Sequence, residues 1–240
     1  RLLRLSRPRG AMVLMSWAAR PLAAQTRPSL KTAAARLQKT VVTLRIRHEQ
    51  KEGQSAETAS KSESRITVCS GVLLENGRIA TSMPLGKNYS SVHVTLPGGE
   101  QAAARVRVVD EYSRLSLLRI DRDDLERADW EGIPYAQTLP QVGDWLVSGA
   151  GWGAKKPVIS FGLVSGTDVA VPQTTFPPLL RCDMRTAKTS SGAAVTDQNG
   201  QLVGIVVLTD RSGEFGGWTY AVPVAHVLRL SRTLDESNNQ

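Results

Sequence analysis

The chain has 240 residues, of which 41% are hydrophobic and 22% are charged, and this composition excludes wholesale disorder, collagen and coiled coil. Its formal net charge is +8, but five arginines fall within the first 24 residues, which hold no acidic residue. Removing those five charges leaves +3, so the basic balance does not indicate nucleic-acid binding.

Residues 1–24 are typical of a secretory signal peptide. An arginine-rich start over residues 1–10 is followed by a short apolar run over residues 11–19 and then by small residues. Arg20 interrupts the apolar run and no acidic residue precedes Glu49, so a mitochondrial transit peptide and a solvated basic tail are the alternatives. We therefore expect an exported protein, periplasmic or secreted, with a mitochondrial location as the alternative.

A short helix and a series of strands follow. Residues 28–40 have apolar residues at helical spacing, and Ser29 is placed to cap the first turn. Beyond the helix, short runs rich in Val, Ile and Leu are bounded by turn residues and predict strands. The first six are expected at 41–47, 66–74, 78–82, 91–96, 102–109 and 115–120, with two-residue hairpin turns at Asn76-Gly77 and Gly98-Gly99.

Two polar segments divide the expected strands. Residues 49–65 hold no large apolar side chain and predict a mobile surface loop, whereas residues 121–140 predict a connector rich in Asp. Residues 224–230 predict a terminal helix. A second set of six strands is expected at 144–148, 158–165, 179–184, 193–196, 202–208 and 218–222, with another hairpin turn at Asn199-Gly200.

Six strands, a connector and six more strands predict an all-β fold of two packed six-stranded antiparallel barrels, with a short N-terminal helix and a C-terminal helix. The expected organisation is a signal peptide at 1–24, a linker and the start of the helix at 25–36, the first barrel at 37–140, the second barrel with the terminal helix at 141–232, and a tail at 233–240.

Six segments of the chain resemble, in order, a trypsin-like serine peptidase of the HtrA/Deg type. They are SGVLL and NGRIAT within 70–81, LSLLRI at 115–120, VGDW at 142–145, FGLVS at 161–165, SG and GQLVGI within 191–205, and YAVP at 220–223. The resemblance covers about residues 37–232. It implies the double-barrel fold and a cleft between the barrels that binds extended peptide.

The resemblance also implies a catalytic triad, of which this chain keeps only the serine. Ser191 occupies the nucleophile position, but Pro84 stands where the family has its histidine and Arg114 where it has its aspartate. Proline cannot accept a proton, and arginine cannot orient an imidazole. Thr189 replaces the glycine whose N–H serves the oxyanion site, and a β-branched residue resists the backbone angles that glycine accepts. These departures predict a catalytically degenerate domain.

No other group is an obvious base. The chain has three histidines, His48, His93 and His226, and all lie away from the expected site. Lys188 lies three residues before Ser191, so a residual serine hydrolase that uses this lysine is the alternative.

The expected partners follow from the cleft. We expect binding of an extended peptide, of an unfolded protein segment or of an active paralogue, either in the cleft or by docking of a barrel face. No nucleic acid, cofactor or metal is expected, and an oligomer stays open. No stretch of about 18 apolar residues occurs, so no firm membrane span is expected.

Cys69 and Cys182 are expected not to form a disulfide. Cys69 alternates with an apolar face of its strand, so it should point away from that face, while Cys182 should face into the second barrel. The two thiols should then lie in different layers, beyond the roughly 7 Å Cα separation that a disulfide permits. The expected apolar face consists of Ile66, Val68, Val72 and Leu74.

Overall fold

A computed structural model describes most of the chain after the N-terminal segment. The described residues are 29–48, 65–86, 89–120, 131–153, 155–172, 174–210 and 217–238. The predicted signal peptide, the predicted loop except Arg65, and residues 121–130 of the connector lie outside them.

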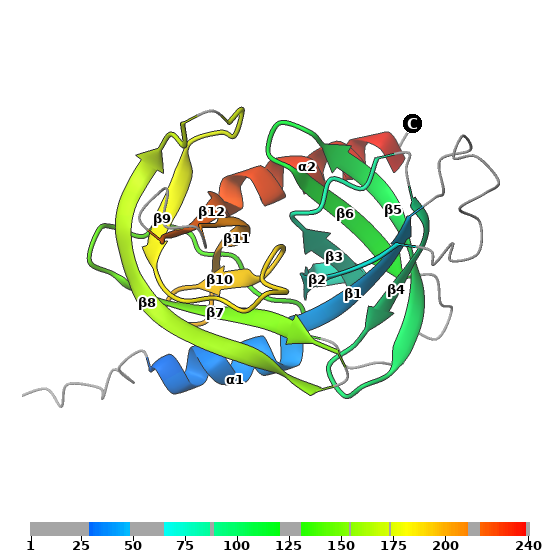
Figure 1. The fold of residues 1–240 in the computed structure, drawn as a ribbon, viewed down its shortest axis with the longest axis horizontal. Helices are drawn as coiled ribbons and strands as arrows, with labels where there is room; N and C mark the ends of the chain where they lie inside the picture. The colour runs from blue at the N-terminus through cyan, green and yellow to red at the C-terminus, as the bar shows by residue number, and fades with distance from the viewer. Residues whose placement is uncertain are drawn as a thin grey trace, which may run out of the picture.

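Twelve strands in the described residues form two closed antiparallel barrels, as predicted (Figure 1). Helix α1 (Leu30–Thr40) precedes the first barrel, and helix α2 (Val224–Asn238) follows the second. The first barrel has the order β1-β2-β3-β6-β5-β4 and contains β1 (Val41–His48), β2 (Ile66–Leu73), β3 (Arg78–Thr81), β4 (Tyr89–Thr95), β5 (Gln101–Asp110) and β6 (Leu115–Ile120). The second has the order β10-β11-β12-β9-β8-β7 and contains β7 (Trp145–Trp152), β8 (Lys155–Val169), β9 (Leu179–Asp183), β10 (Ala194–Thr196), β11 (Leu202–Thr209) and β12 (Thr219–Pro223).

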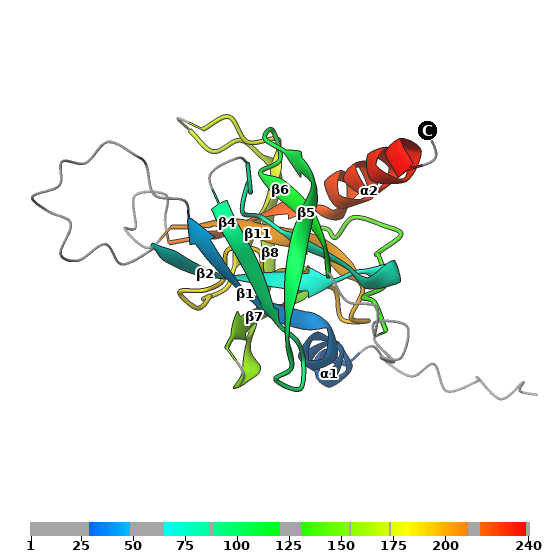
Figure 2. The same ribbon diagram turned by 90° about the vertical axis from the view of Figure 1, so that its right-hand side faces the viewer.

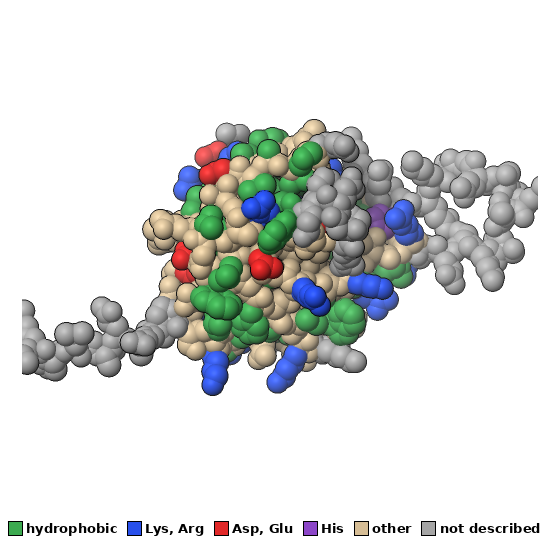
Figure 3. All heavy atoms as spheres, turned by 60° about the vertical axis from the view of Figure 1, so that its left-hand side comes forward, with side chains coloured by type: hydrophobic (Ala, Val, Ile, Leu, Met, Phe, Trp, Pro, Cys, Tyr) green, Lys and Arg blue, Asp and Glu red, His purple; other side chains and the backbone are tan. Residues whose placement is uncertain are grey.

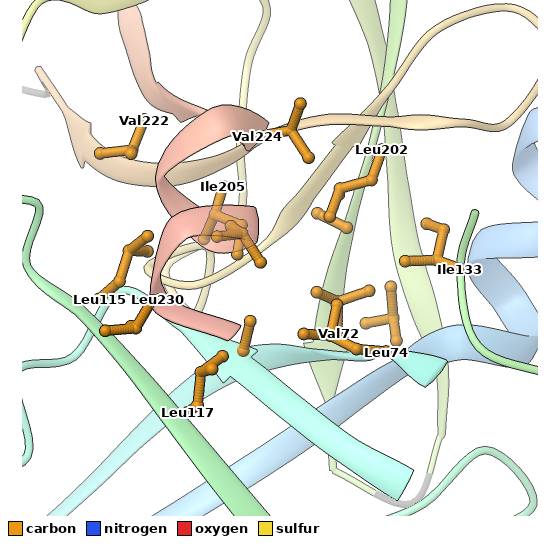
Figure 4. Packing of buried hydrophobic residues seen from close by; sticks show 14 of the residues in the cluster. Val72, Leu74, Leu115, Leu117, Ile133, Leu202, Ile205, Val222, Val224 and Leu230 are labelled. Carbon is orange, nitrogen blue, oxygen red and sulfur yellow. The ribbon is translucent and has the colours of Figure 1, made fainter. Parts of the chain in front are cut away.

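Each barrel has its own apolar interior, and a third cluster joins the barrels to the helices. Successive side chains at the end of β2 point alternately into two of these cores. Leu73 points into the first barrel, while Val72 and Leu74, directly after β2, belong to the shared cluster. Figure 4 shows the shared cluster, in which Leu230 of α2 packs over residues from both barrels. The barrels therefore form one packed unit.

Helix α1 begins as the sequence predicts. The backbone N–H of Lys31 donates to Ser29 Oγ at 3.3 Å, which satisfies one of the free donors of the first turn. Leu37 is fully buried against β7, where a Cβ added to Gly149 would lie 3.1 Å from the Leu37 Cβ. A side chain at Gly149 would therefore push the helix away from the second barrel.

The terminal helix is longer than predicted. It continues from Val224 to Asn238, so most of the predicted tail at 233–240 is helical. Leu234 is buried in the shared cluster, and Asp235 forms an ion pair with Arg78 of β3. These tertiary contacts hold the last turns, and the periodicity of residues 224–230 does not reveal them.

The hairpin turns have three residues where the sequence analysis expected two. In each, the backbone N–H of the last residue before the loop donates to the carbonyl of the first residue after it, and glycine with positive φ occupies the third loop position. The pairs are Leu74 and Arg78 at 2.8 Å, Leu96 and Glu100 at 2.8 Å, and Asp197 and Gln201 at 3.0 Å.

The second half of the connector is part of the core. Ile133 is fully buried, and its N–H donates to the carbonyl of Leu73 at 3.0 Å. Pro134 accepts from the N–H of Leu202 at 2.7 Å, so residues 131–136 lie between the barrels. Ile133 therefore contributes more to the core than the polar composition of this segment suggests.

Both cysteines are free thiols, as predicted. Cys69 lies inside the first barrel and Cys182 inside the second, and burial raises the pKa of each thiol to about 12. The expected face of β2 was wrong, because Ile66 and Val68 are exposed by 45% and 41% while Cys69 is buried. The apolar character of residues 66–68 therefore does not mark the inside of the barrel.

Candidate functional site

Ser191 lies in the loop that joins β9 to β10, and backbone hydrogen bonds fix this loop between the barrels. The carbonyl of Ser191 accepts from the N–H of Ser70 on β2 at 2.8 Å, and the N–H of Gly192 donates to the carbonyl of Val206 on β11 at 2.8 Å. Gly192 has φ of 81°, and a Cβ there would lie 2.1 Å from the carbonyl oxygen of Ser70. Glycine is therefore required next to Ser191 on two independent grounds.

The hydroxyl of Ser191 pairs with the hydroxyl of Ser82. The two Oγ atoms are 3.0 Å apart, Ser82 is buried directly after β3, and Ser191 is half-buried. Serine hydroxyls donate and accept hydrogen bonds, but a neutral hydroxyl is too weak a base to activate another at neutral pH. The pair therefore positions Ser191 without activating it.

Sequence reasoning missed Ser82. Its signal was its place at the end of a predicted strand, two residues before Pro84, where the resemblance puts the catalytic histidine. The contact itself joins residues 109 positions apart, and no local pattern predicts it.

Pro84 lies in a segment that is held against the start of β6. Ser116 Oγ accepts from the N–H of Leu85 at 3.0 Å and donates to the carbonyl of Met83 at 2.6 Å. Ser116 is the ladder partner of Thr81, so the end of β3 and the start of β6 lie side by side. The structure thus places Pro84 close to both Ser82 and the start of β6.

Arg114 directly precedes β6 and is exposed. Its φ is 60°, a value uncommon for a residue with a side chain, and its Cζ lies 5.9 Å from the centroid of the Phe176 ring. This distance permits a cation–π contact. The structure brings the start of β6 to the site, but it directs the Arg114 side chain to Phe176.

The turn before Arg114 contains a carboxylate, Asp110, with a structural role. Asp110 accepts from Ser113 Oγ at 2.6 Å, from the N–H of Tyr112 at 3.1 Å and from Arg229 of α2 at 3.1 Å. Burial alone would raise the pKa of Asp110, but these hydrogen bonds together hold it below its ordinary value. This carboxylate therefore ties the turn to α2.

Thr189 anchors the loop through its side chain. Its Oγ1 donates to the carbonyl of Gly151 on β7 at 2.7 Å, and its own carbonyl accepts from Ser70 Oγ. Ser70 Oγ in turn accepts from the N–H of Gly151 at 2.9 Å. Thr189 is not among the described residues with positive φ, so the backbone at this position does not need the freedom of glycine.

The three histidines of the chain lie on β1, β4 and α2. His48 Nε2 is 2.8 Å from Thr67 Oγ1, and His93 is exposed on β4. His226 Nδ1 is 3.1 Å from Arg229 Nη2, and burial followed by the Arg229 charge lowers the pKa of His226. No imidazole is hydrogen-bonded to Ser191 within the described residues.

Lys188, the alternative base, is exposed at the loop surface, whereas the hydroxyl of Ser191 pairs with that of Ser82. The described part of the chain contains no group of three or more His, Cys, Asp or Glu side chains that could hold a metal ion. Neither described helix is long and apolar enough to cross a membrane.

This arrangement of barrels and loop matches known proteins. The family model of the trypsin-like peptidase domain matches residues 69–205, and the chain belongs to this family. A protein of Hahella chejuensis named "Probable periplasmic serine endoprotease DegP-like" is 25% identical over 177 residues, which are 73% of this chain and 37% of the relative. A protein of the same name from Pseudomonas savastanoi pv. phaseolicola is 26% identical over 168 residues, which are 69% and 34% of the two chains.

Solved structures show the same fold. The HtrA-type protease AlgW with a tripeptide has a TM-score of 0.70 at 20% identity, and the match covers 88% of this chain and 65% of that chain. AlgW with a decapeptide has a TM-score of 0.68 at 18% identity, with 87% and 68% covered. The chain spans about a third of the length of the curated relatives that it matches.

Proposed function

We propose that this chain is a catalytically inactive member of the trypsin-like peptidase family that acts by binding extended peptide or a partner protein between its barrels. One observation carries the proposal. The hydroxyl of Ser191 has the hydroxyl of Ser82 at 3.0 Å, where a serine peptidase needs an imidazole. A proton can shift between two hydroxyls, but no group in the pair can hold it at neutral pH.

The family positions support this proposal. Pro84 and Arg114 replace the histidine and the aspartate, and the Arg114 side chain contacts Phe176. Disabling one catalytic residue of a serine peptidase can cost about 10⁶ in rate, and further losses add little. The rate that survives, roughly 10³–10⁴ over water, depends on the oxyanion site and substrate binding. Thr189 occupies a donor position of that oxyanion site, so this remainder is reduced as well.

Peptide binding does not need the triad. A peptide that adds to a sheet edge is held by backbone hydrogen bonds, with pockets for alternate side chains, and none of these requires a catalytic base. The similar AlgW structures are complexes with a tripeptide and a decapeptide, which supports peptide as the ligand class. The names of the relatives and the pattern of residues 1–24 support an exported location.

The test is labelling by a fluorophosphonate probe together with binding of an unfolded protein. We expect no labelling of Ser191 and measurable binding of reduced, carboxymethylated casein to the chain. Labelling that is lost in Ser191→Ala would contradict inactivity, and loss of that labelling in Lys188→Ala as well would favour the hydrolase that uses Lys188. Absence of both labelling and binding would leave a structural partner of an active paralogue as the better account.

A further inference from the structure

The outer face of the first barrel carries a row of basic side chains on β1 and its neighbouring strands. Cross-strand partners share one face of a sheet, and Arg45 on β1 lies opposite Val68 on β2 and His93 on β4. Arg47, two residues along β1, lies opposite Ile66 on β2. All five side chains are exposed, and Figure 2 presents this side of the barrel to the viewer.

The row continues across the sheet. His93 lies opposite Ala103 on β5, and Arg105 on the same strand lies opposite Arg119 on β6. The outward positions of β1, β2 and β4 within the described residues include no Asp or Glu, and Glu100 lies beyond the row in the hairpin before β5. We call the set Arg45, Arg47, His93, Arg105 and Arg119 the arginine face.

The second barrel presents a different surface. Its exposed large side chains on β7 and β8 are Trp145, Trp152, Val158 and Phe161. Figure 3 shows hydrophobic side chains gathered on the side that it presents, with the charged side chains scattered among them. The exposed side chains of β7 and β8 therefore include large apolar groups that differ from the arginines on β1.

The arginine face also has a hollow of about 220 Å³. Its lining consists of Arg45, Arg47, Ile66, His93 and Gln101. Two arginine side chains thus border a hollow whose lining also includes the aliphatic Ile66. A ligand of this hollow would carry negative charge together with apolar groups.

The spacing of the groups indicates the shape of the ligand. Arg45 and Arg47 stand two residues apart on one strand, about 6.6–6.8 Å along its axis, and Ile66 and Val68 form a parallel apolar row with the same spacing. An extended polypeptide repeats its side chains on one side at this distance. We propose that the arginine face binds an acidic, extended polypeptide segment whose alternate glutamate carboxylates meet Arg45 and Arg47 and whose glutamate methylene groups cover Ile66 and Val68.

The lining favours a polypeptide over a nucleic acid. Single-stranded nucleic acids bind through aromatic side chains on which bases stack, in addition to basic residues. None of the described residues that line the hollow is Phe, Tyr or Trp. Ile66 and Val68, which are aliphatic and exposed, suit the methylene stems of glutamate side chains.

Fluorescence anisotropy with the full chain tests the proposal. The probe is a fluorescein-labelled dodecapeptide with Glu at alternate positions, separated by Val and Thr, and the control peptide has Gln in place of Glu. We expect the Glu peptide to bind at 50 mM NaCl, to bind more weakly at 300 mM NaCl because exposed charges are screened, and to bind more tightly than the Gln peptide.

A matched pair of double variants locates the site. Arg45→Glu with Arg47→Glu reverses two charges of the arginine face, and Lys156→Glu with Arg232→Glu reverses two exposed charges elsewhere. We expect about a tenfold or greater loss of affinity in the first variant and less than about twofold in the second, because only the first exchanges attraction for repulsion at the site. Arg45→Gln with Arg47→Gln covers the case in which charge reversal impairs folding.

Three results would overturn the proposal. These are no binding of the Glu peptide at 50 mM NaCl, equal weakening by both double variants, and tighter binding of a 12-nucleotide single-stranded DNA or of vesicles containing phosphatidylglycerol than of the Glu peptide. The last result would assign the arginine face to another class of anion.

Discussion

At the scale of single residues, the site is defined by what surrounds Ser191. Ser82 supplies a hydroxyl, Thr189 ties the loop to β7, and Gly192 lets β2 approach. Each of these residues has a physical reason to be where it is, and none of the reasons requires catalysis. The loop is therefore an ordered structure that does not depend on a working triad.

Replacement of Gly192 by a residue with a side chain should strongly destabilise the fold. Gly192→Ala forces a Cβ to within 2.1 Å of a backbone oxygen at a φ of 81°, so we expect a loss of about 3 kcal/mol or more in the free energy of unfolding, measured by urea denaturation. Gly217→Ala is the matched control, because Gly217 has φ of 75° with no atom within 4 Å of the added Cβ. The control should lose only about 1–2 kcal/mol. Equal losses would show that close approach to β2 has no effect.

The lowered pKa of Asp110 makes the free energy of unfolding depend on pH. Because its pKa is lower in the folded chain than its ordinary value of 3.8, the stability that it contributes is present above that value and is lost as pH falls through the folded pKa. We expect the free energy of unfolding to fall as pH is lowered from about 5 to 2.5, with a shallower fall in Asp110→Asn. Urea denaturation at each pH measures this, and parallel curves would contradict the role of Asp110.

At the scale of elements, the barrels place like charges opposite one another. Arg119 on β6 lies between Arg105 on β5 and Arg78 on β3, and Arg78 also forms an ion pair with Asp235 of α2. Like charges directly opposite on a sheet are destabilising. The Arg119 side chain therefore costs the first barrel some stability.

Substitution of Arg119 tests this cost. We expect Arg119→Gln to raise the free energy of unfolding by about 0.5 kcal/mol at 20 mM salt and to have almost no effect at 0.5 M salt, because salt screens exposed charges. Lys156→Gln, an exposed position on the second barrel, serves as the control. A gain that persists unchanged at high salt would point to β-propensity and not to charge.

The same elements show how far the sequence predicts the fold. The cap at Ser29, the spacing of Leu37 and the runs of Val and Ile predict α1 and all twelve strands, because these signals are local. The hairpins were predicted one residue too short, since a glycine at the end of the turn fits both kinds of loop. The core role of Ile133 and the last turns of α2 depend on contacts between distant segments, which no local pattern contains.

At the scale of the whole molecule, the sequence likewise predicts some features of the candidate site and not others. Ser191, Pro84, Arg114 and Thr189 could be named from the sequence because the resemblance fixes their positions in order. The Ser82 contact could not be predicted, because it depends on how the end of β3 meets the loop before β10. The sequence therefore predicts which catalytic groups are replaced, while the structure shows what stands beside the serine.

Repair of the site follows from this account. Pro84→His alone would place an imidazole near Arg114 with no carboxylate to fix its tautomer, and Arg114→Asp alone would supply a carboxylate with no imidazole to orient. We expect no turnover of unfolded casein from either single variant. Thr189→Gly should help most when added to the double variant, because groups that act as a unit are non-additive and one oxyanion donor is worth about 10²–10³ in rate. A single repair that restores turnover would contradict this account.

The most direct test of inactivity is turnover of unfolded casein by the unaltered chain compared with Ser191→Ala. The account predicts that both proteins show the same background rate, because the hydroxyl of Ser191 is paired with that of Ser82 and no imidazole is bound to it. Turnover by the unaltered chain that disappears in Ser191→Ala would contradict the account and establish a working hydrolase.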